Sequence, residues 1–76
     1  MKTYILKASV EQEEDGRWSS WIEMLPGCAA WGYSPEEALS ALKDAAEAYI
    51  EDVLEAGDQL PSGIEVTESP VVTITV

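Results

Sequence analysis

The sequence predicts an α+β fold with the element order β-β-β-α-β, in which one long helix packs on one face of a small sheet. Two observations predict it. Apolar and polar residues alternate before the middle of the chain and at its end, and apolar residues recur at helical spacing in between. The chain has 76 residues, a length typical of one small domain, so we expect residues 1–76 to form a single domain.

The first three strands are expected to form an antiparallel meander. Alternation predicts strands over residues 3–11 and 17–24. Asp15-Gly16 predicts a hairpin between them, because both residue types tolerate a positive φ. Pro26-Gly27 predicts a second turn, after which a third short strand covers about residues 28–33.

The middle of the chain carries the strongest signal, which is that of a helix over residues 35–56. Ser34 suits the N-cap, Pro35 suits the first helical position, and Gly57 is placed to end the helix in a left-handed conformation. The apolar stripe is predicted to comprise Leu39, Leu42, Ala46, Tyr49, Ile50 and Val53. An isolated helix cannot bury such a stripe, so the sheet is its expected partner.

A final strand is predicted over residues 71–76, after a polar connection with a short extended piece at residues 64–67. We expect this strand to return beside the first strand and parallel to it, through a right-handed crossover by way of the helix. Trp18 is expected in the core between sheet and helix. The opposite sheet face would be uncovered, and it would carry Ile5, Trp21 and either Cys28 with Ala30 or Ala29 with Trp31.

The composition is strongly acidic, with 15 acidic residues, 4 Lys and Arg, no His and a formal net charge of −11. This charge repels a phosphate backbone, so we expect no direct binding of nucleic acid. The absence of His excludes a Ser-His-Asp triad and an imidazole zinc site. One Cys cannot form an internal disulfide, which fits a reducing compartment and a cytoplasmic protein. No run approaches the roughly 20 apolar residues of a membrane span.

The acidic side chains are the candidate partner-binding residues. Five fall on the helix face opposite the apolar stripe, and three lie at the hairpin tip: Glu37, Asp44, Glu47, Glu51 and Glu55, then Glu13, Glu14 and Asp15. Two interpretations stay open, a solvated surface or a landing surface for a basic partner. A carboxylate metal site or a metal-dependent hydrolase is a third, which a ridge of acids disfavours because its members do not converge. No catalytic, cofactor or metal residue is assigned.

Two apolar features remain. Cys28 is expected to be a small buried side chain, since no base or positive charge nearby would activate its thiol. Ile5 and Trp21 on the uncovered sheet face predict a homo-oligomer, a dimer or a tetramer, because exposed apolar patches mark contacts.

Several segments occur together in a characteristic order. Leu25 to Cys28 is followed by Trp31 to Ser34 and by Glu36 to Leu39; the other matching residues are Glu14 to Trp18, Ala46, Tyr49, Ile50, Leu54, Leu60 and Pro61. Together they resemble the HicB family of antitoxins, and the resemblance covers nearly the whole chain. It implies a partial ribonuclease-H-like domain with the element order given above.

The resemblance also implies a function without catalysis or cofactor. HicB-like proteins neutralise small basic HicA-type mRNA-cleaving ribonucleases by blocking the active site. The alternative is a solitary HicB-like oligomeric module with another protein or a small ligand as partner. Many HicB antitoxins carry a C-terminal DNA-binding segment, and this sequence ends at Val76. We therefore expect a short form, in which any operator binding depends on a companion protein.

Overall fold

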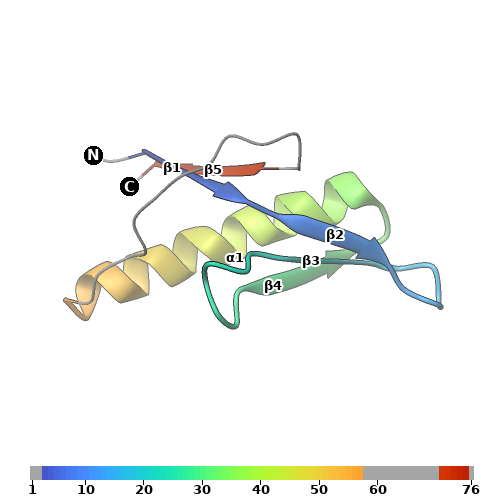
Figure 1. Cartoon of the computed structure of the whole chain (residues 1–76), viewed down its shortest axis with the longest axis horizontal. Coiled ribbons are helices and arrows are strands. Elements are labelled where there is room, and N and C mark those ends of the chain that lie inside the picture. The colour runs from blue at the N-terminus through green and yellow to red at the C-terminus, as the bar shows by residue number, and fades with distance from the viewer. Residues whose placement is uncertain (1–2, 58–70, 76) are drawn as a thin grey trace.

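The computed structural model describes residues 3–57 and 71–75 (Figure 1). The elements in order are β1 (Thr3–Lys7), β2 (Ser9–Gln12), β3 (Trp18–Trp21), β4 (Ala29–Gly32), α1 (Pro35–Glu55) and β5 (Val71–Thr75). The single long helix lies along one face of the strands (Figure 1). The predicted α+β class and the packing of helix on sheet are confirmed; the extended piece predicted at residues 64–67 lies outside the described residues.

The predicted first strand is present as two strands, β1 and β2, which follow one almost continuous path (Figure 1). The strand ladder is interrupted at Ala8, where the chain changes its neighbour. β1 pairs with β5, whereas β2 pairs with β3 in the three-stranded sheet β2-β3-β4. The side-chain alternation continues through the interruption, since Leu6 and Ala8 are both buried. The antiparallel meander is confirmed for β2, β3 and β4.

The predicted direction of the final strand is wrong. β5 lies beside β1 as expected, but it runs antiparallel to it, with Leu6 opposite Val72. The right-handed crossover rule applies to two strands that are already parallel. It does not require the strand after a helix to run parallel to the first strand. Residues 56–70 separate α1 from β5, and a segment of this length allows the chain to enter β5 from the other end.

The hairpin between β2 and β3 closes through a glycine. The amide of Gly16 donates to the carbonyl of Glu13 at 3.0 Å, and the amide of Glu13 donates to the carbonyl of Arg17 at 2.7 Å. Gly16 has a φ of +91° and no non-glycine residue described has a positive φ. The turn therefore needs the left-handed conformation at Gly16 alone, and not at Asp15 as well.

The ends of α1 follow the local sequence. The Ser34 hydroxyl accepts the amide hydrogen of Glu37 at 3.0 Å, and the Glu37 carboxylate accepts that of Tyr33 at 3.3 Å. The first bond satisfies an amide donor that the first helical turn leaves free, and the second ties the residue before the N-cap to the helix. The helix ends at Glu55, one residue earlier than predicted, and Gly57 follows with a φ of +80°.

The buried stripe of α1 is centred on small residues as well as large ones: Ala38, Leu42, Ala46 and Ile50. Ala38 brings the helix close to the sheet, because the buried hydroxyl of Ser20 donates to the Ala38 carbonyl at 2.8 Å. The core also contains Leu6, Ala8, Ile22, Leu25, Cys28 and Val72. Trp18, expected in this core, is only partly buried.

Candidate functional site

The sheet face turned away from α1 carries exposed aromatic side chains. Cys28, just before β4, and Ala30 on β4 belong to the helix side, since Cys28 is buried and Ala30 packs on the core. Ala29 and Trp31 therefore face outward, which decides between the two arrangements that the sequence left open. Trp31 is 51% exposed and Tyr33 70%.

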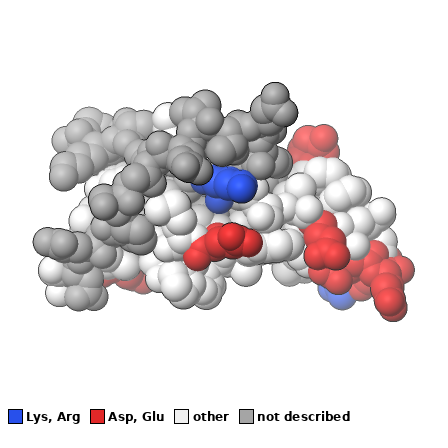
Figure 2. All heavy atoms as spheres, in the orientation of Figure 1, with Lys and Arg blue, Asp and Glu red and all other residues white. Residues whose placement is uncertain are grey.

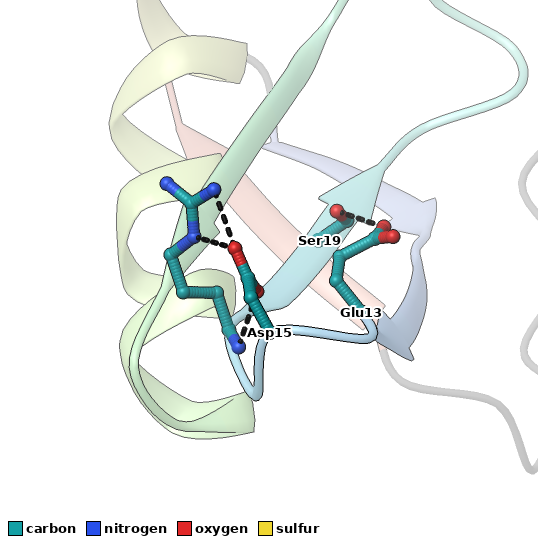
Figure 3. Close-up of polar contacts among 4 residues, drawn as sticks. Glu13, Asp15 and Ser19 are labelled. Carbon is teal, nitrogen blue, oxygen red and sulfur yellow. Dashed lines mark hydrogen bonds and ion pairs between the residues drawn. The ribbon is translucent and has the colours of Figure 1, made fainter.

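A network of hydrogen bonds orders the hairpin tip beside these aromatic residues. The Asp15 carboxylate accepts hydrogen bonds from the backbone amide of Arg17 at 3.0 Å and from its Nε at 2.7 Å, and it pairs with its Nη2 at 2.6 Å. The Glu13 carboxylate accepts the hydroxyl of Ser19 at 2.6 Å. Figure 3 shows both sets of contacts on the same turn. Asp15 and Glu13 are thus fixed in direction, whereas no hydrogen bond among the described residues holds Glu14.

Arg17 joins the acidic tip to the aromatic residues. Its Cζ lies 5.2 Å from the centre of the Trp31 ring, within the range of a cation–π contact. Trp31 in turn meets Tyr33 edge to face, with ring centres 5.3 Å apart and an interplanar angle of 86°. Such edge-to-face pairs are favourable because the positive ring edge meets the negative ring face.

These residues surround a shallow open depression of about 590 Å³, lined by Glu13, Glu14, Asp15, Arg17, Ser19 and Trp31. Acidic side chains gather at the hairpin end of the molecule, on the right in Figure 2. We call these six residues together with Tyr33 the hairpin surface. It brings three predicted candidates, the acids of the tip, into one place with aromatic residues.

The other predicted acids form a separate surface on α1. Each of the five is exposed, and we call them the helix acidic face: Glu37, Asp44, Glu47, Glu51 and Glu55. None of them lines the depression. Glu37 has a structural task as well, because its carboxylate accepts the backbone amide of Tyr33, just before the N-cap.

The predicted oligomer residues lie on the same sheet face as Trp31. Ile5 and Trp21 are partly buried within the chain rather than fully exposed. Trp21 pairs with Ala29 in the register, one step along β3 from the pair of Ser19 and Trp31. The two residues are therefore displaced from the hairpin tip toward β1.

The ion pair at the tip gives a testable acid–base property. Hydrogen bonds from the Arg17 side chain, and next from its backbone amide, hold the pKa of the Asp15 carboxyl below its usual value. Because the folded-state pKa is lowered, this contact stabilises the fold above the unfolded-state pKa and ceases to do so as the pH falls through the folded-state pKa. We expect an NMR titration to give Asp15 a pKa below that of a free aspartate, and Arg17→Ala to raise it. An ordinary pKa for Asp15 in the unmodified chain would show that the ion pair does not persist in solution.

The remaining reactive group is the Cys28 thiol. Burial raises its pKa, so the thiol stays protonated near neutral pH and is a weak nucleophile. The expectation of a small buried side chain is confirmed, with Cys28 4% exposed. Within residues 3–57 and 71–75, no three Cys, Asp or Glu residues are grouped so that they could hold a metal ion. In the same part of the chain, no helix is long and apolar enough to cross a membrane.

Comparison with known families gives the chain its context. Residues 6–71 match the family described as HicB_like antitoxin of bacterial toxin-antitoxin system. The chain belongs to the HicB-like antitoxin family. Antitoxins of this family are generally not enzymes. A relative from Thermoplasma acidophilum, UPF0150 protein Ta0767, is 35% identical over 52 residues, which cover 68% of this chain and 75% of that protein.

Solved HicB structures share the fold. The N-terminal domain of the Burkholderia pseudomallei antitoxin HicB superposes with a TM-score of 0.74 at 13% identity, covering 95% of this chain and 96% of that domain. The longer structure of the same antitoxin gives a TM-score of 0.70 at 14% identity. It matches 100% of this chain, which spans 64% of that antitoxin. At such low identity the two structures support the fold.

Sequence reasoning did not assign four residues of the hairpin surface: Arg17, Ser19, Trp31 and Tyr33. A partial signal for them was present. The alternation over residues 17–24 puts Arg17 and Ser19 on one face of their strand, but the parity of the strand after Pro26-Gly27 was open, and the structure shows that Ser19 lies opposite Trp31. With that register, Arg17 is a diagonal neighbour of Trp31, close enough for long side chains to touch.

Proposed function

We propose that this chain is an antitoxin that binds a small basic HicA-type ribonuclease in the cytoplasm and blocks its active site. The observation that carries the proposal is the match of residues 6–71 to the HicB-like antitoxin family. The net charge of −11 supports it, because a ribonuclease that binds mRNA presents a cationic surface. The antitoxin competes with RNA for that surface and performs no chemistry.

The acidic surfaces give the interaction its expected physical character. Complementary charges steer the partners together and raise the association rate, while shape and buried contacts set the lifetime of the complex. Exposed charges are screened within about 8 Å at physiological ionic strength. Association is therefore expected to slow as salt is added, with a smaller effect on dissociation.

The test is rescue of growth together with binding. A gene for a HicA-type toxin is expected beside this gene. That toxin is expressed in a bacterial host, where it is expected to arrest growth, and co-expression of this chain is expected to restore growth. Purified chain is expected to bind a catalytically inactive variant of the toxin, and to prevent RNA cleavage by the active toxin at a one-to-one ratio. No rescue together with no binding would refute the proposal.

Self-association through Ile5 and Trp21 is a separate proposal. Light scattering after size-exclusion chromatography is expected to give a multiple of the 8.3 kDa chain mass. Trp21→Glu is expected to shift the protein to the monomer mass while the helical circular dichroism is retained, because a charge is costly in an apolar contact. Ala48→Glu, which adds the same charge at an exposed position of α1, is the matched control and is expected to keep the oligomer. A monomer mass for the unmodified chain would contradict this proposal and leave the antitoxin function intact.

A further inference from the structure

We propose that the basic ribonuclease docks on the hairpin surface, centred on Trp31 and Tyr33, and not on the helix acidic face. This inference rests on the proposed function and adds the surface that performs it. Both surfaces are acidic, so charge alone does not distinguish them. The arguments that do are aromatic exposure, order and the placement of charge.

The first argument is the exposed aromatic area. Trp31 and Tyr33 are the two exposed aromatic residues in the part of the chain that the structure describes, and they lie in contact with each other. Trp, Tyr and Arg are the residue types that most often contribute the largest share of binding free energy in protein interfaces. The helix acidic face offers charge without an exposed aromatic side chain, and the exposed large apolar residue of α1 is Leu54. Charged residues without an apolar side chain that becomes buried in the interface change the association rate more than the affinity.

The second argument is order. Asp15 holds the Arg17 guanidinium at two nitrogens, Arg17 covers one side of Trp31, and Trp31 contacts Tyr33. Side chains that are already fixed lose little conformational entropy when a partner binds. By contrast, no hydrogen bond or ion pair among the described residues holds Glu47 or Glu51 on the helix acidic face. Ordering those two long side chains would therefore cost binding free energy.

The third argument is the placement of charge, which favours a basic partner on this surface over a second copy of the chain. Arg17 neutralises Asp15, whereas Glu13 and Glu14 have no ion-pair partner among the described residues. Their two negative charges lie at the rim of the depression beside the aromatic centre. A second copy of the chain that docked here would bring its own Glu13 and Glu14 against these two charges, which disfavours a second copy at this position. A partner surface rich in Lys and Arg is attracted by the rim and can place a cation against the exposed aromatic faces.

The experiment compares two double variants that remove the same charge. Glu13→Gln with Glu14→Gln acts on the hairpin surface, and Glu47→Gln with Glu51→Gln acts on the helix acidic face. Both give the same net charge, and glutamine at position 13 keeps an oxygen that can accept the Ser19 hydroxyl. Binding to the inactive HicA-type toxin is measured by surface plasmon resonance at low salt. The double variant of the hairpin surface (the hairpin pair) is expected to associate about tenfold more slowly than the unmodified chain. The double variant of the helix acidic face (the helix pair) is expected to associate less than about twofold more slowly.

A third variant tests the aromatic centre. Trp31→Ala is expected to raise the Kd for the inactive toxin about 30-fold or more, mainly through faster dissociation. Since Trp31 is half exposed, the thermal midpoint should change little, and circular dichroism checks this. Glu47→Gln with Glu51→Gln then serves as the folded control with normal affinity.

The outcomes separate this inference from the proposed function. If the unmodified chain fails to bind the toxin, the proposed function is refuted and the inference falls with it. If the unmodified chain binds but Trp31→Ala binds equally well, or the helix pair slows association as much as the hairpin pair, the function stands and the inference is wrong. A Trp31→Ala variant that changes the mass of the toxin-free protein would place a second copy on this surface, and would likewise overturn the inference.

Discussion

Gly32→Ala is expected to destabilise the protein by about 3 kcal/mol, a large effect for the addition of one methyl group. A Cβ at position 32 would lie 2.6 Å from the backbone nitrogen of Ala38, and 2.8 Å from the carbonyl carbon of Glu37. Both atoms belong to the backbone of α1, so no side-chain rotation relieves the clash. The helix must move away from β4, and the contacts beneath its first turns are lost with it.

The loss is large against the total stability. A chain of this length is expected to unfold at a cost of about 4–11 kcal/mol. Urea denaturation followed by circular dichroism measures the change, at one fixed protein concentration because self-association would add to the apparent stability. The buried bond from Ser20 to the Ala38 carbonyl lies in the same contact, so Gly32→Ala is expected to weaken it too.

Gly57→Ala is the matched control for this prediction. Gly57 has a φ of +80°, and a Cβ there would meet no atom within 4 Å. The substitution therefore lowers the free energy of unfolding only through the unfavourable left-handed backbone conformation of an alanine, by about 1 kcal/mol. Equal losses at positions 32 and 57 would contradict the steric argument, because they would show that only backbone freedom matters at both glycines.

Much of this fold follows from local sequence signals. Ser34, Pro35 and Gly57 place both ends of α1 to within one residue, because each acts through bonds or dihedral angles of its own turn. The alternation over residues 3–11 gives the buried side of this segment correctly, since Leu6 and Ala8 are buried. It cannot show that the pairing partner changes at Ala8 from β5 to β3. The same residues are buried whether the segment pairs with one strand or with two. The direction of β5 is seen in its pairing with β1, and no local pattern encodes it.

The candidate site also contains some residues that could be chosen from the sequence and others that could not. Acidic residues at a hairpin tip are exposed in almost any fold, so Glu13, Glu14 and Asp15 could be chosen from the sequence. The outward direction of Trp31 depends on the parity of β4 after the turn at Pro26-Gly27, which leaves two arrangements equally open. The contact between Arg17 and Trp31 needs the register of β3 against β4, and the contact between Glu13 and Ser19 needs that of β2 against β3. Structure was required to join residues that the sequence separates by two turns.

The second large effect is expected in the core of α1. Leu42 is fully buried and lies between Ala38 and Ala46 on the buried stripe. The two alanines let the helix approach the sheet, and Leu42 supplies the volume that fills the space between them. Leu42→Ala removes that volume, and the neighbouring helix backbone is already too close to the sheet to collapse further into the gap. A residual cavity therefore adds to the lost burial, and the expected cost is about 3 kcal/mol.

A cost of this size lowers the thermal midpoint by about 15 °C in a domain of this length. Leu54→Ala is the matched control, because it makes the same chemical change on the same helix at a side chain that is 45% exposed. Its expected cost is below about 0.5 kcal/mol. Leucine and alanine are both good helix formers, so the change in helix propensity is small at either position and the difference between the two variants measures mainly burial. A difference below about 1 kcal/mol would mean that Leu42 does not fill the space between α1 and the sheet, and the packing described for this face of the helix would then be incorrect.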